Sequence, residues 1–450
     1  MARIENPARV LGLFDAVCIV IGAIIGVGIF FSPSKTAGVV TGSGEALAAW
    51  AVAGFIAMCG ALTFAELGGR YNGNGAQYEI LRDAYGPLPA FLYVFCNATA
   101  IQTGAIGVIA TVCIDHVFAA AGRAQPPLSV TLPAACVLVV GLMAANILGV
   151  KWGSRIANAT VAAKVLTLLA ITGMALWHTG DPPQAPAPPR VTGGMVGILS
   201  ALVFAFFAYG GWQHALWIAG EVKEPRRNLP RAIIIGVVCV VAVYLLANWA
   251  YLRLLGHAGV AASKTLAADA AGAVIGPTGG RIIAGAVALS AFGVLNAQLL
   301  AGPRLIYGMA VDGRFFPVFA RLSPRFGTPV AAILLLGVLS ILLLVLAGPS
   351  AVDLLGTGAV FIDGVFFGLT GLALILIRRA SGAPEGYRVP LYPLVPLLFV
   401  LGELGLLTGA MLNPHTLKVS VIGVAWIIAA GVVYAVWFRR RVTAVEHRGQ

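Results

Sequence analysis

Two glycine clusters within apolar stretches are the residues of this sequence best suited to bind a small molecule. The first stretch, "IGAIIGVGIFFSPS", holds Gly22, Gly26 and Gly28, and the second, "FAYGGWQH", holds the adjacent Gly210 and Gly211. Glycine destabilises a helix interior by up to about 1 kcal/mol relative to alanine, so each cluster predicts a break in a helix. Close packing against a neighbouring helix is the alternative, and it explains one cluster better than two.

A broken helix exposes backbone groups that can bind a ligand. Freed N–H groups at the start of a half-helix, together with the positive end of its dipole, suit a carboxylate. Freed carbonyls at the end of the other half suit an ammonium group. An α-amino acid carries both groups on one carbon, so the breaks predict an amino acid ligand. No covalent chemistry, cofactor or metal is expected from these groups.

The segments that hold the breaks are membrane helices. The chain has 450 residues, of which 59% are hydrophobic and 10% charged, and its mean hydropathy is +0.93. A soluble protein of this length needs more polar surface, so we expect a multi-pass protein of the lipid bilayer. A spanning helix needs roughly 20 apolar residues, and about twelve stretches qualify. They are 14–38, 45–68, 88–120, 129–148, 155–177, 195–220, 229–253, 278–307, 328–347, 351–378, 391–412 and 418–438.

The charges between these stretches predict the orientation. The chain has 29 Lys and Arg against 17 Asp and Glu. Most of the basic residues lie near the N-terminus and in the even-numbered connections, so the positive-inside rule places both termini in the cytoplasm and the chain in the cytoplasmic (inner) membrane. They form no cluster on a soluble module, so nucleic acid is not an expected partner. The six cysteines lie in apolar stretches and are expected to be buried side chains.

The two breaks also predict an internal repeat. Each lies in the first helix of a block of five helices, which is typical of transporters built from two inverted repeats. We therefore expect an all-α membrane protein with its first repeat in residues 1–178 and its second in 195–380. The Pro-rich stretch 179–194 is expected to be an extracellular loop, and 381–450 to hold two further helices and a short cytoplasmic tail.

Five blocks in order resemble the amino acid–polyamine–organocation superfamily, and in particular its L-type amino acid transporter branch and related bacterial permeases. They are "IGAIIGVGIFFSPS", "FAELGGRYNGNGAQYEILRDAYGPLPAFLY", "NILGVKWGSRIANATVAAKVLTLLA", "FAYGGWQHALWIAGEVKEPRRNLPRAI" and "SAFGVLNAQLLAGPRLIYGMAVDGRFFPVFARLSP". The resemblance extends over nearly the whole chain. It implies a LeuT-like fold of two inverted five-helix repeats plus two helices, with helices 1 and 6 discontinuous.

The resemblance also implies a binding mode for the main-chain groups of the ligand. The carboxylate would lie on amides around Val27, Gly28 and Ile29. The amine would lie on carbonyls near Ile24 in helix 1 and near Phe206–Phe207 in helix 6. A small-molecule amino acid is thus the expected partner.

Other positions extend or depart from the family pattern. Tyr209 and Trp212 flank the second break and are expected to wall or gate the side-chain pocket. Val27 stands where serine is common, so the amides would bind the carboxylate without a hydroxyl. Gly364 stands where relatives often carry tryptophan, which predicts an enlarged or reshaped cavity. The loop "AAGRAQPPL" lacks the cysteine through which relatives hold a heavy subunit, so no covalent heavy-subunit partner is expected.

Lys164 lies in the middle of the predicted fifth helix, where a lysine is costly and usually has a functional role and a partner. Snorkelling to the interface is the alternative, which this depth disfavours. In sodium-coupled relatives of the fold a cation lies between helices 1 and 8. The resemblance implies that the Lys164 ammonium takes its place, near the carbonyl of Gly22 and the Ser290 region. Transport would then be sodium-independent, and a role of Lys164 in proton coupling stays open.

Further ionisable residues lie within or at the ends of the predicted helices. Asp363 is mid-span in the tenth, and a proton relay, a contact with a cationic substrate and a hydrogen-bonded structural role are all compatible with it. Glu66, Glu221 and Arg304 lie at cytoplasmic helix ends, where they would form gate ion pairs or ordinary interfacial charges. His214 follows the second break and is expected to be a hydrogen-bonded helix residue rather than a proton shuttle.

These features favour a secondary transporter that works by alternating access, and the apolar pocket favours sodium-independent exchange of neutral L-amino acids. Proton-coupled symport is an alternative, as is a cationic amino acid or polyamine substrate if Asp363 faces the pocket.

An amino acid sensor on the same scaffold would usually need a signalling domain. An enzyme that uses Asp363 and His214 would need a third residue to orient the base. The sequence contains no GxxxxGK[ST] motif for ATP.

Overall fold

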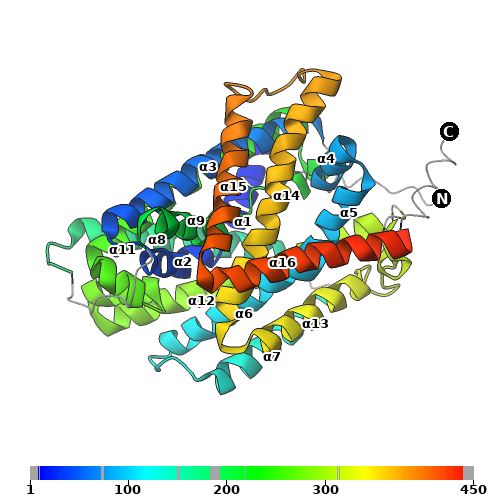
Figure 1. Cartoon of the computed structure of the whole chain (residues 1–450). Helices are drawn as coiled ribbons and strands as arrows, with labels where there is room; N and C mark the ends of the chain where they lie inside the picture. Colours follow the sequence, from blue (N-terminus) through cyan, green and yellow to red (C-terminus); the bar gives the residue numbers. More distant parts are fainter. Residues whose placement is uncertain are drawn as a thin grey trace, which may run out of the picture.

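The structure is a computed structural model that describes residues 9, 11–71, 76–148, 153–182, 193–217, 219–311, 313 and 315–438. The described chain is an assembly of packed helices (Figure 1). Within it no β-strand forms, and an isolated bridge pairs Leu11 with Val222. The expectation of an all-α architecture is therefore confirmed.

The first half of the chain forms eight α-helices and one π-helical turn. They are α1 (Leu13–Ile24), α2 (Gly28–Ala37), α3 (Ser43–Arg70), α4 (Ala76–Tyr85), α5 (Pro87–Cys96), η1 (Asn97–Ile101), α6 (Gln102–Ala120), α7 (Leu128–Ile147) and α8 (Gly153–Trp177).

The second half forms eight further α-helices and four short turns. They are α9 (Gly194–Tyr209), α10 (His214–Trp217), η2 (Ala219–Glu221), α11 (Pro225–Ala262), α12 (Leu266–Val311), η3 (Pro317–Ala320), α13 (Val330–Ala347), η4 (Gly348–Ser350), α14 (Ala351–Ser381), α15 (Leu394–Leu412), α16 (Pro414–Val433) and η5 (Tyr434–Phe438).

Each predicted apolar stretch overlaps a helix, but the count of twelve spans stays a prediction. In the described parts of the chain, nine helical stretches are long and apolar enough to cross a membrane, and ten if the bent pair α1 and α2 is one span. The count is lower because α13 and α14 run together as a stretch of 52 residues. In addition, the apolar part of α8 is described only over Val161–Trp177, which is shorter than a full span.

The helices form two packed groups. One group brings together α1, α2, α3, α9 and α11, and the other brings together α6, α7, α12 and α13. Helix α8 packs on members of both groups, because it contacts α1, α11 and α12. Helix α14 runs alongside α15 and also contacts α6, α9 and α16 (Figure 1). The glycine clusters thus lie at the ends of helices of the first group.

Candidate functional site

The two glycine clusters are breaks, and the breaks lie against each other. Helix α1 ends at Ile24 and α2 begins at Gly28, with a bend of 43° between them. Helix α9 ends at Tyr209, and a turn leads into α10. A Cβ atom on Gly28 would lie 2.7 Å from Ala208 Cα of α9. Only a residue without a side chain allows the two half-helices to approach so closely.

Gly211 allows the second break to approach the first closely. Its φ is 130°, in a region that residues with side chains rarely adopt. A Cβ atom there would lie 2.5 Å from the carbonyl oxygen of Ala23. Its neighbour Gly210 has φ −59° and no such contact, since a Cβ atom on it would lie 3.4 Å from its nearest neighbour, Phe206 O. A side chain is therefore tolerated less well at position 211 than at position 210.

The breaks leave backbone groups for binding, and one tyrosine already satisfies some of them. The first amides of α2, around Val27 and Gly28, have no carbonyl one turn earlier in the helix. At the end of α1, the carbonyl of Ile24 accepts from Gly26 N at 2.7 Å and from Tyr244 Oη at 3.0 Å. Tyr244 Oη also lies 3.2 Å from Ala208 O, so this buried residue of α11 bridges both breaks.

Tyr244 changes the expected binding mode of the amine. The carbonyl of Ile24, which the family resemblance offers to the ligand, is already engaged by two donors. The carbonyl of Phe206 accepts from Gly210 N at 2.8 Å. The amides of α2 are therefore the more available half of the main-chain site. The sequence "VVAVYLLANWA" contains no feature that assigns this bridging role to its tyrosine.

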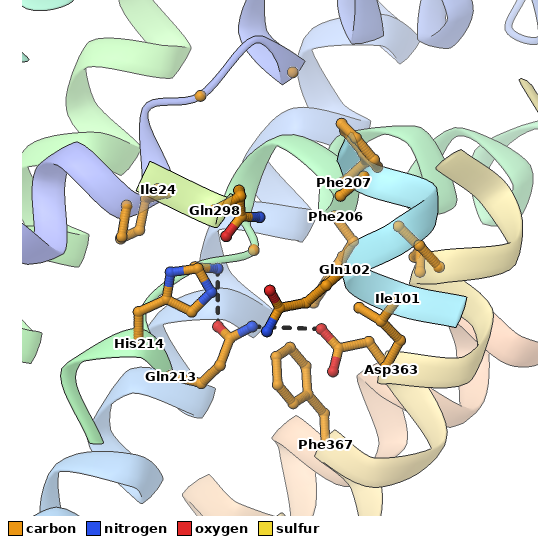
Figure 2. A pocket seen from close by; sticks show the side chains of 18 of the residues that line it. Ile24, Ile101, Gln102, Phe206, Phe207, Gln213, His214, Gln298, Asp363 and Phe367 are labelled. Atoms are coloured by element: carbon orange, nitrogen blue, oxygen red, sulfur yellow. Dashed lines mark hydrogen bonds between the residues drawn. The ribbon is translucent and has the colours of Figure 1, made fainter. Parts of the chain in front are cut away.

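A cavity of ≈ 120 Å³ lies beside the breaks, which is room for several water molecules or one small ligand. Residues of α1, α2, η1, α6, α9, α10, α12, α14 and α15 line it. The predicted binding residues in the lining are Ile24, Val27, Gly28, Phe206 and Phe207. Figure 2 labels Ile24, Phe206 and Phe207 among them. Three others are buried outside this lining, namely Ile29, Tyr209 and Trp212.

The two predicted wall aromatics pack behind the cavity. The hydroxyl of Tyr209 donates to the backbone oxygen of Trp50 at 3.3 Å. Trp212 stacks on Phe367 with 5.2 Å between ring centroids, and it is Phe367 that lines the cavity. Tyr209 and Trp212 therefore support the wall, and a role for them in gating stays a prediction.

A chain of hydrogen bonds joins the second break to α14. The N–H of Gly211 donates to Gln213 Oε1 at 2.9 Å, and Gln213 Nε2 donates to Asp363 Oδ2 at 3.4 Å (Figure 2). Asp363 lines the cavity, and a cationic amino acid or polyamine is the alternative substrate that the sequence leaves open if this residue faces the pocket. Gln213 was missed in the sequence, although it follows the glycine pair closely. His214 also lines the cavity and stacks on Trp217 at 4.1 Å.

A second carboxylate, Glu403 of α15, lines the same cavity. It is 1% exposed. A Cβ atom on Gly364 would lie 3.2 Å from Glu403 Oε2, so the small residue at 364 leaves room for this carboxylate. Glu403 was not predicted from the sequence, although a lone charge in the apolar run "LLFVLGELGLL" is itself a sign of function.

Lys164 lies apart from the cavity lining, at the contact between α8 and α1. Its side chain is buried, with 2% exposed, and Nζ lies 3.4 Å from the carbonyl oxygen of Gly22. The helices approach closely here, because a Cβ atom on Gly22 would lie 2.6 Å from Val161 Cγ2. Ser290 is also buried, and its Oγ has no hydrogen-bond partner among the described residues. The geometry thus places the ammonium on a carbonyl of the first broken helix.

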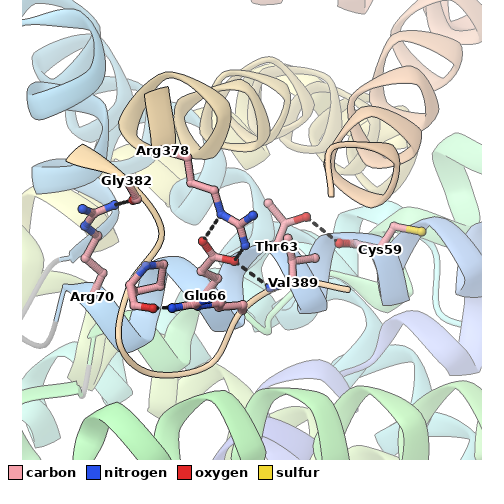
Figure 3. Close-up of polar contacts among 9 residues, drawn as sticks. Cys59, Thr63, Glu66, Arg70, Arg378, Gly382 and Val389 are labelled. Carbon is pink, nitrogen blue, oxygen red and sulfur yellow. Dashed lines mark hydrogen bonds and ion pairs between the residues drawn. The ribbon is translucent and has the colours of Figure 1, made fainter. Parts of the chain in front are cut away.

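Glu66 has a partner that the sequence did not predict. Its carboxylate, 1% exposed, binds Arg378 of α14 and accepts from Arg378 Nε and from Val389 N, both at 2.6 Å (Figure 3). The guanidinium also lies 4.0 Å from the ring centroid of Tyr392. These contacts join α3, α14 and the segment that leads into α15.

The other two predicted gate residues lie elsewhere. Arg304 is exposed on α12. The backbone oxygen of Glu221 accepts from Leu11 N at 3.0 Å. Neither side chain is in the ion pairs of the described chain, so Glu66, Glu221 and Arg304 do not form one cluster in this structure.

Comparisons with known proteins decide the family. The sequence model of the family described as "Amino acid permease" matches residues 11–438. This chain belongs to that family.

Relatives of this permease are amino acid transporters. The b(0,+)-type amino acid transporter 1 of Homo sapiens is 31% identical over 411 residues, which cover 90% of this chain and 83% of that protein. The serine/threonine exchanger SteT of Bacillus subtilis (strain 168) is 30% identical over 412 residues, with 90% and 91% covered. The large neutral amino acids transporter small subunit 2 of Homo sapiens is 30% identical over 403 residues, with 86% and 74% covered.

A solved structure shows the same fold. The inward-facing conformation of Mhp1 superposes on this permease with a TM-score of 0.55, over 93% of this chain and 92% of that one. The two sequences are 14% identical, so the likeness is one of fold alone. The LeuT-like fold expected from the sequence is therefore confirmed.

The break at Gly211 gives a first test. We expect Gly211→Ala to lower transport at least tenfold, because a side chain at this φ costs on the order of 1–3 kcal/mol and collides with Ala23 O. Gly210→Ala is the matched control and should lose much less. Initial uptake rates at equal amounts of folded protein measure both. Equal losses in the two variants would contradict the proposed geometry of the break.

The Glu66 cluster gives a second test, on stability. Arg378→Ala leaves a buried carboxylate without its counter-ion, so we expect a loss of about 3–5 kcal/mol in the free energy of unfolding. Arg379→Ala removes the neighbouring exposed charge and should change stability little. Thermal unfolding in detergent compares the two variants with wild type. A midpoint for Arg378→Ala that equals that of the control would show that the pair is not a structural clamp.

Proposed function

We propose that this permease is a sodium-independent exchanger of L-amino acids in the cytoplasmic membrane, and that it works by alternating access. The observation that carries the proposal is the pair of crossed helix breaks beside a cavity of ≈ 120 Å³. Unsatisfied backbone groups at membrane depth are tolerated only where they face protein or a cavity with a partner. An amino acid supplies that partner. The relative SteT is named as a serine/threonine exchanger, which supports exchange as the mode of transport.

Different residues of the site bind different parts of the ligand. The amides at Val27 and Gly28 hold the carboxylate at the start of α2, where the helix dipole is positive. The side chain of the ligand extends over Phe206 and Phe207 towards α14, and these apolar walls suit neutral amino acids. No covalent step is needed, which agrees with the transporter relatives.

Lys164 acts as a fixed cation. Its ammonium lies on the Gly22 carbonyl, between α8 and the first broken helix, where a bound metal cation would otherwise compensate the freed carbonyls. A tethered ammonium cannot dissociate at either side of the membrane. Transport therefore requires no sodium gradient.

The cycle moves one helix group against the other. The group of α1, α2, α3, α9 and α11 carries the breaks and rocks against the group of α6, α7, α12 and α13. We assign the first inverted repeat to residues 1–178 and the second to 195–380, with both termini in the cytoplasm. Residues 121–127, between α6 and α7, hold no cysteine, so no disulfide to a heavy subunit is proposed there.

Reconstituted transport tests the function. Purified permease in proteoliposomes is offered a panel of radiolabelled amino acids, with and without internal amino acid, sodium and a pH gradient. We expect uptake that requires internal amino acid and is indifferent to sodium and to the pH gradient. Uptake into empty vesicles that follows either gradient would contradict the exchange mechanism.

A lysine variant tests the fixed cation. We expect Lys164→Ala to lower exchange at least tenfold without loss of folded protein, because the Gly22 carbonyl loses its donor and α1 its contact with α8. Lys418→Ala removes an exposed lysine and serves as the control. Wild-type exchange rates in Lys164→Ala would exclude the assigned role, and sodium-dependent rescue of that variant would support it.

A further inference from the structure

We propose that Asp363 and Glu403 form a second subsite in the cavity, which binds the cationic end of a ligand's side chain, an ammonium or a guanidinium group. The subsite rests on the proposed amino acid transport and extends its substrates to dibasic amino acids. Glu403 of α15 thereby takes the role of a specificity-determining residue.

Several buried oxygen atoms in the cavity lack donors. Glu403 is 1% exposed, and neither of its carboxylate oxygens has a hydrogen-bond partner among the described residues. The same holds for Oδ1 of Asp363 and for Oε1 of the buried Gln102. All three side chains line one cavity. Buried charges and polar groups without partners are costly, so this set of acceptors calls for a ligand rich in donors.

The cavity also lacks a protein cation that could serve these carboxylates. No lysine or arginine is among the described residues that line it, and His214 is the only other titratable side chain of this described lining. Lys164 lies at the contact of α8 with α1 and is directed to Gly22 O. The two carboxylates therefore have no counter-ion in the described protein.

The number of donors distinguishes a cationic group from a proton. An ammonium group offers three N–H donors and a guanidinium group five. One proton shared between Asp363 and Glu403 would serve two oxygens and leave the other acceptors unsatisfied. A guanidinium group has enough donors for all four of these oxygens and an ammonium group has enough for three, and the charge of either group compensates the carboxylates at the same time.

The cavity offers a route from the helix breaks to the carboxylates. Gly28 and Val27 mark the carboxylate end of the site, and Gln213 connects the second break to Asp363. The rings of Phe207 and Phe367 also line the cavity, where they can contact the methylene stem of a long side chain. Figure 2 shows Asp363 and Gln102 directed into the same space as Gln213.

Gly364 leaves space for the subsite. A Cβ atom at this position would lie 3.2 Å from Glu403 Oε2 and 3.4 Å from Leu406 Cδ2. Even a methyl group here would crowd the Glu403 carboxylate, which would have to shift by a few tenths of an ångström. The glycine at this position of α14 therefore leaves space for the carboxylate from α15 beside the cavity.

Matched competitors test the subsite. L-arginine and L-citrulline have nearly the same shape, but only arginine carries a side-chain cation. Each competes with the amino acid tracer that proteoliposomes exchange fastest. In wild type we expect arginine to compete at least tenfold better than citrulline. In Glu403→Gln and Asp363→Asn this ratio should fall to near one. Glu385→Gln makes the same change at a loop position outside the cavity and should keep the wild-type ratio.

The outcomes separate the subsite from its alternatives. A wild-type ratio near one, or an unchanged ratio in Glu403→Gln, would overturn the proposal. Loss of pH-gradient-driven uptake in Glu403→Gln with an unchanged ratio would also overturn it, in favour of a shared proton. If Glu403→Gln fails to fold, Asp363→Asn carries the test, because it neutralises the other carboxylate that lines the cavity.

A binding measurement separates this proposal from the proposed function. Thermal stabilisation of the detergent-purified permease by arginine, but not by citrulline, is expected in wild type and lost in Glu403→Gln. That result would support the subsite even if no amino acid were exchanged in vesicles, which would refute exchange alone. Equal stabilisation by both compounds would overturn the subsite while leaving exchange of neutral amino acids intact.

Discussion

Backbone N–H and C=O groups cannot be left unpaired in lipid, and most features of this site follow from that constraint. Two helices are broken at membrane depth, so their free groups must meet partners inside the protein. Tyr244 Oη reaches a carbonyl beside each break, and the Lys164 ammonium reaches the Gly22 carbonyl. Val27 and Gly28, at the start of α2, line the cavity instead, and we propose that their amides bind the ligand. The protein thus satisfies part of the freed backbone, and in the proposed function the ligand satisfies the rest.

The same constraint determines where small residues are needed. Gly28 and Gly211 permit the two breaks to pack against each other within van der Waals distance. Gly22 allows α8 to approach α1 closely enough for a lysine to reach a carbonyl. Gly364 leaves space for a carboxylate from another helix. In each case the glycine is needed because a neighbouring helix brings a backbone or side-chain group close to that position.

The sequence predicted the parts of the site that a single segment encodes. The glycine clusters indicated the breaks, and Lys164 and Asp363 were conspicuous as charges in apolar runs. The contacts between side chains were harder to predict, because they join segments that are far apart in the chain. Arg378 meets Glu66 across 312 residues, and Tyr244 meets Ile24 across 220. Tyr209 and Trp212 were expected in the cavity wall from their position beside the break. The turn of the helix there directs them into packing behind Phe367 and against Trp50.

The proposed subsite offers a physical reason for exchange. Without a ligand, the cavity would enclose two carboxylates and the proposed amide site at Val27 and Gly28, and closing it would remove them from water without compensation. A bound dibasic amino acid supplies a carboxylate for the amides and a cation for Asp363 and Glu403. A neutral amino acid supplies the first alone, so the carboxylates must then share a proton or retain water. The loaded carrier can therefore close at lower cost than the unloaded one. A carrier that closes only when loaded must rebind a substrate before it returns, and this is the defining property of an exchanger.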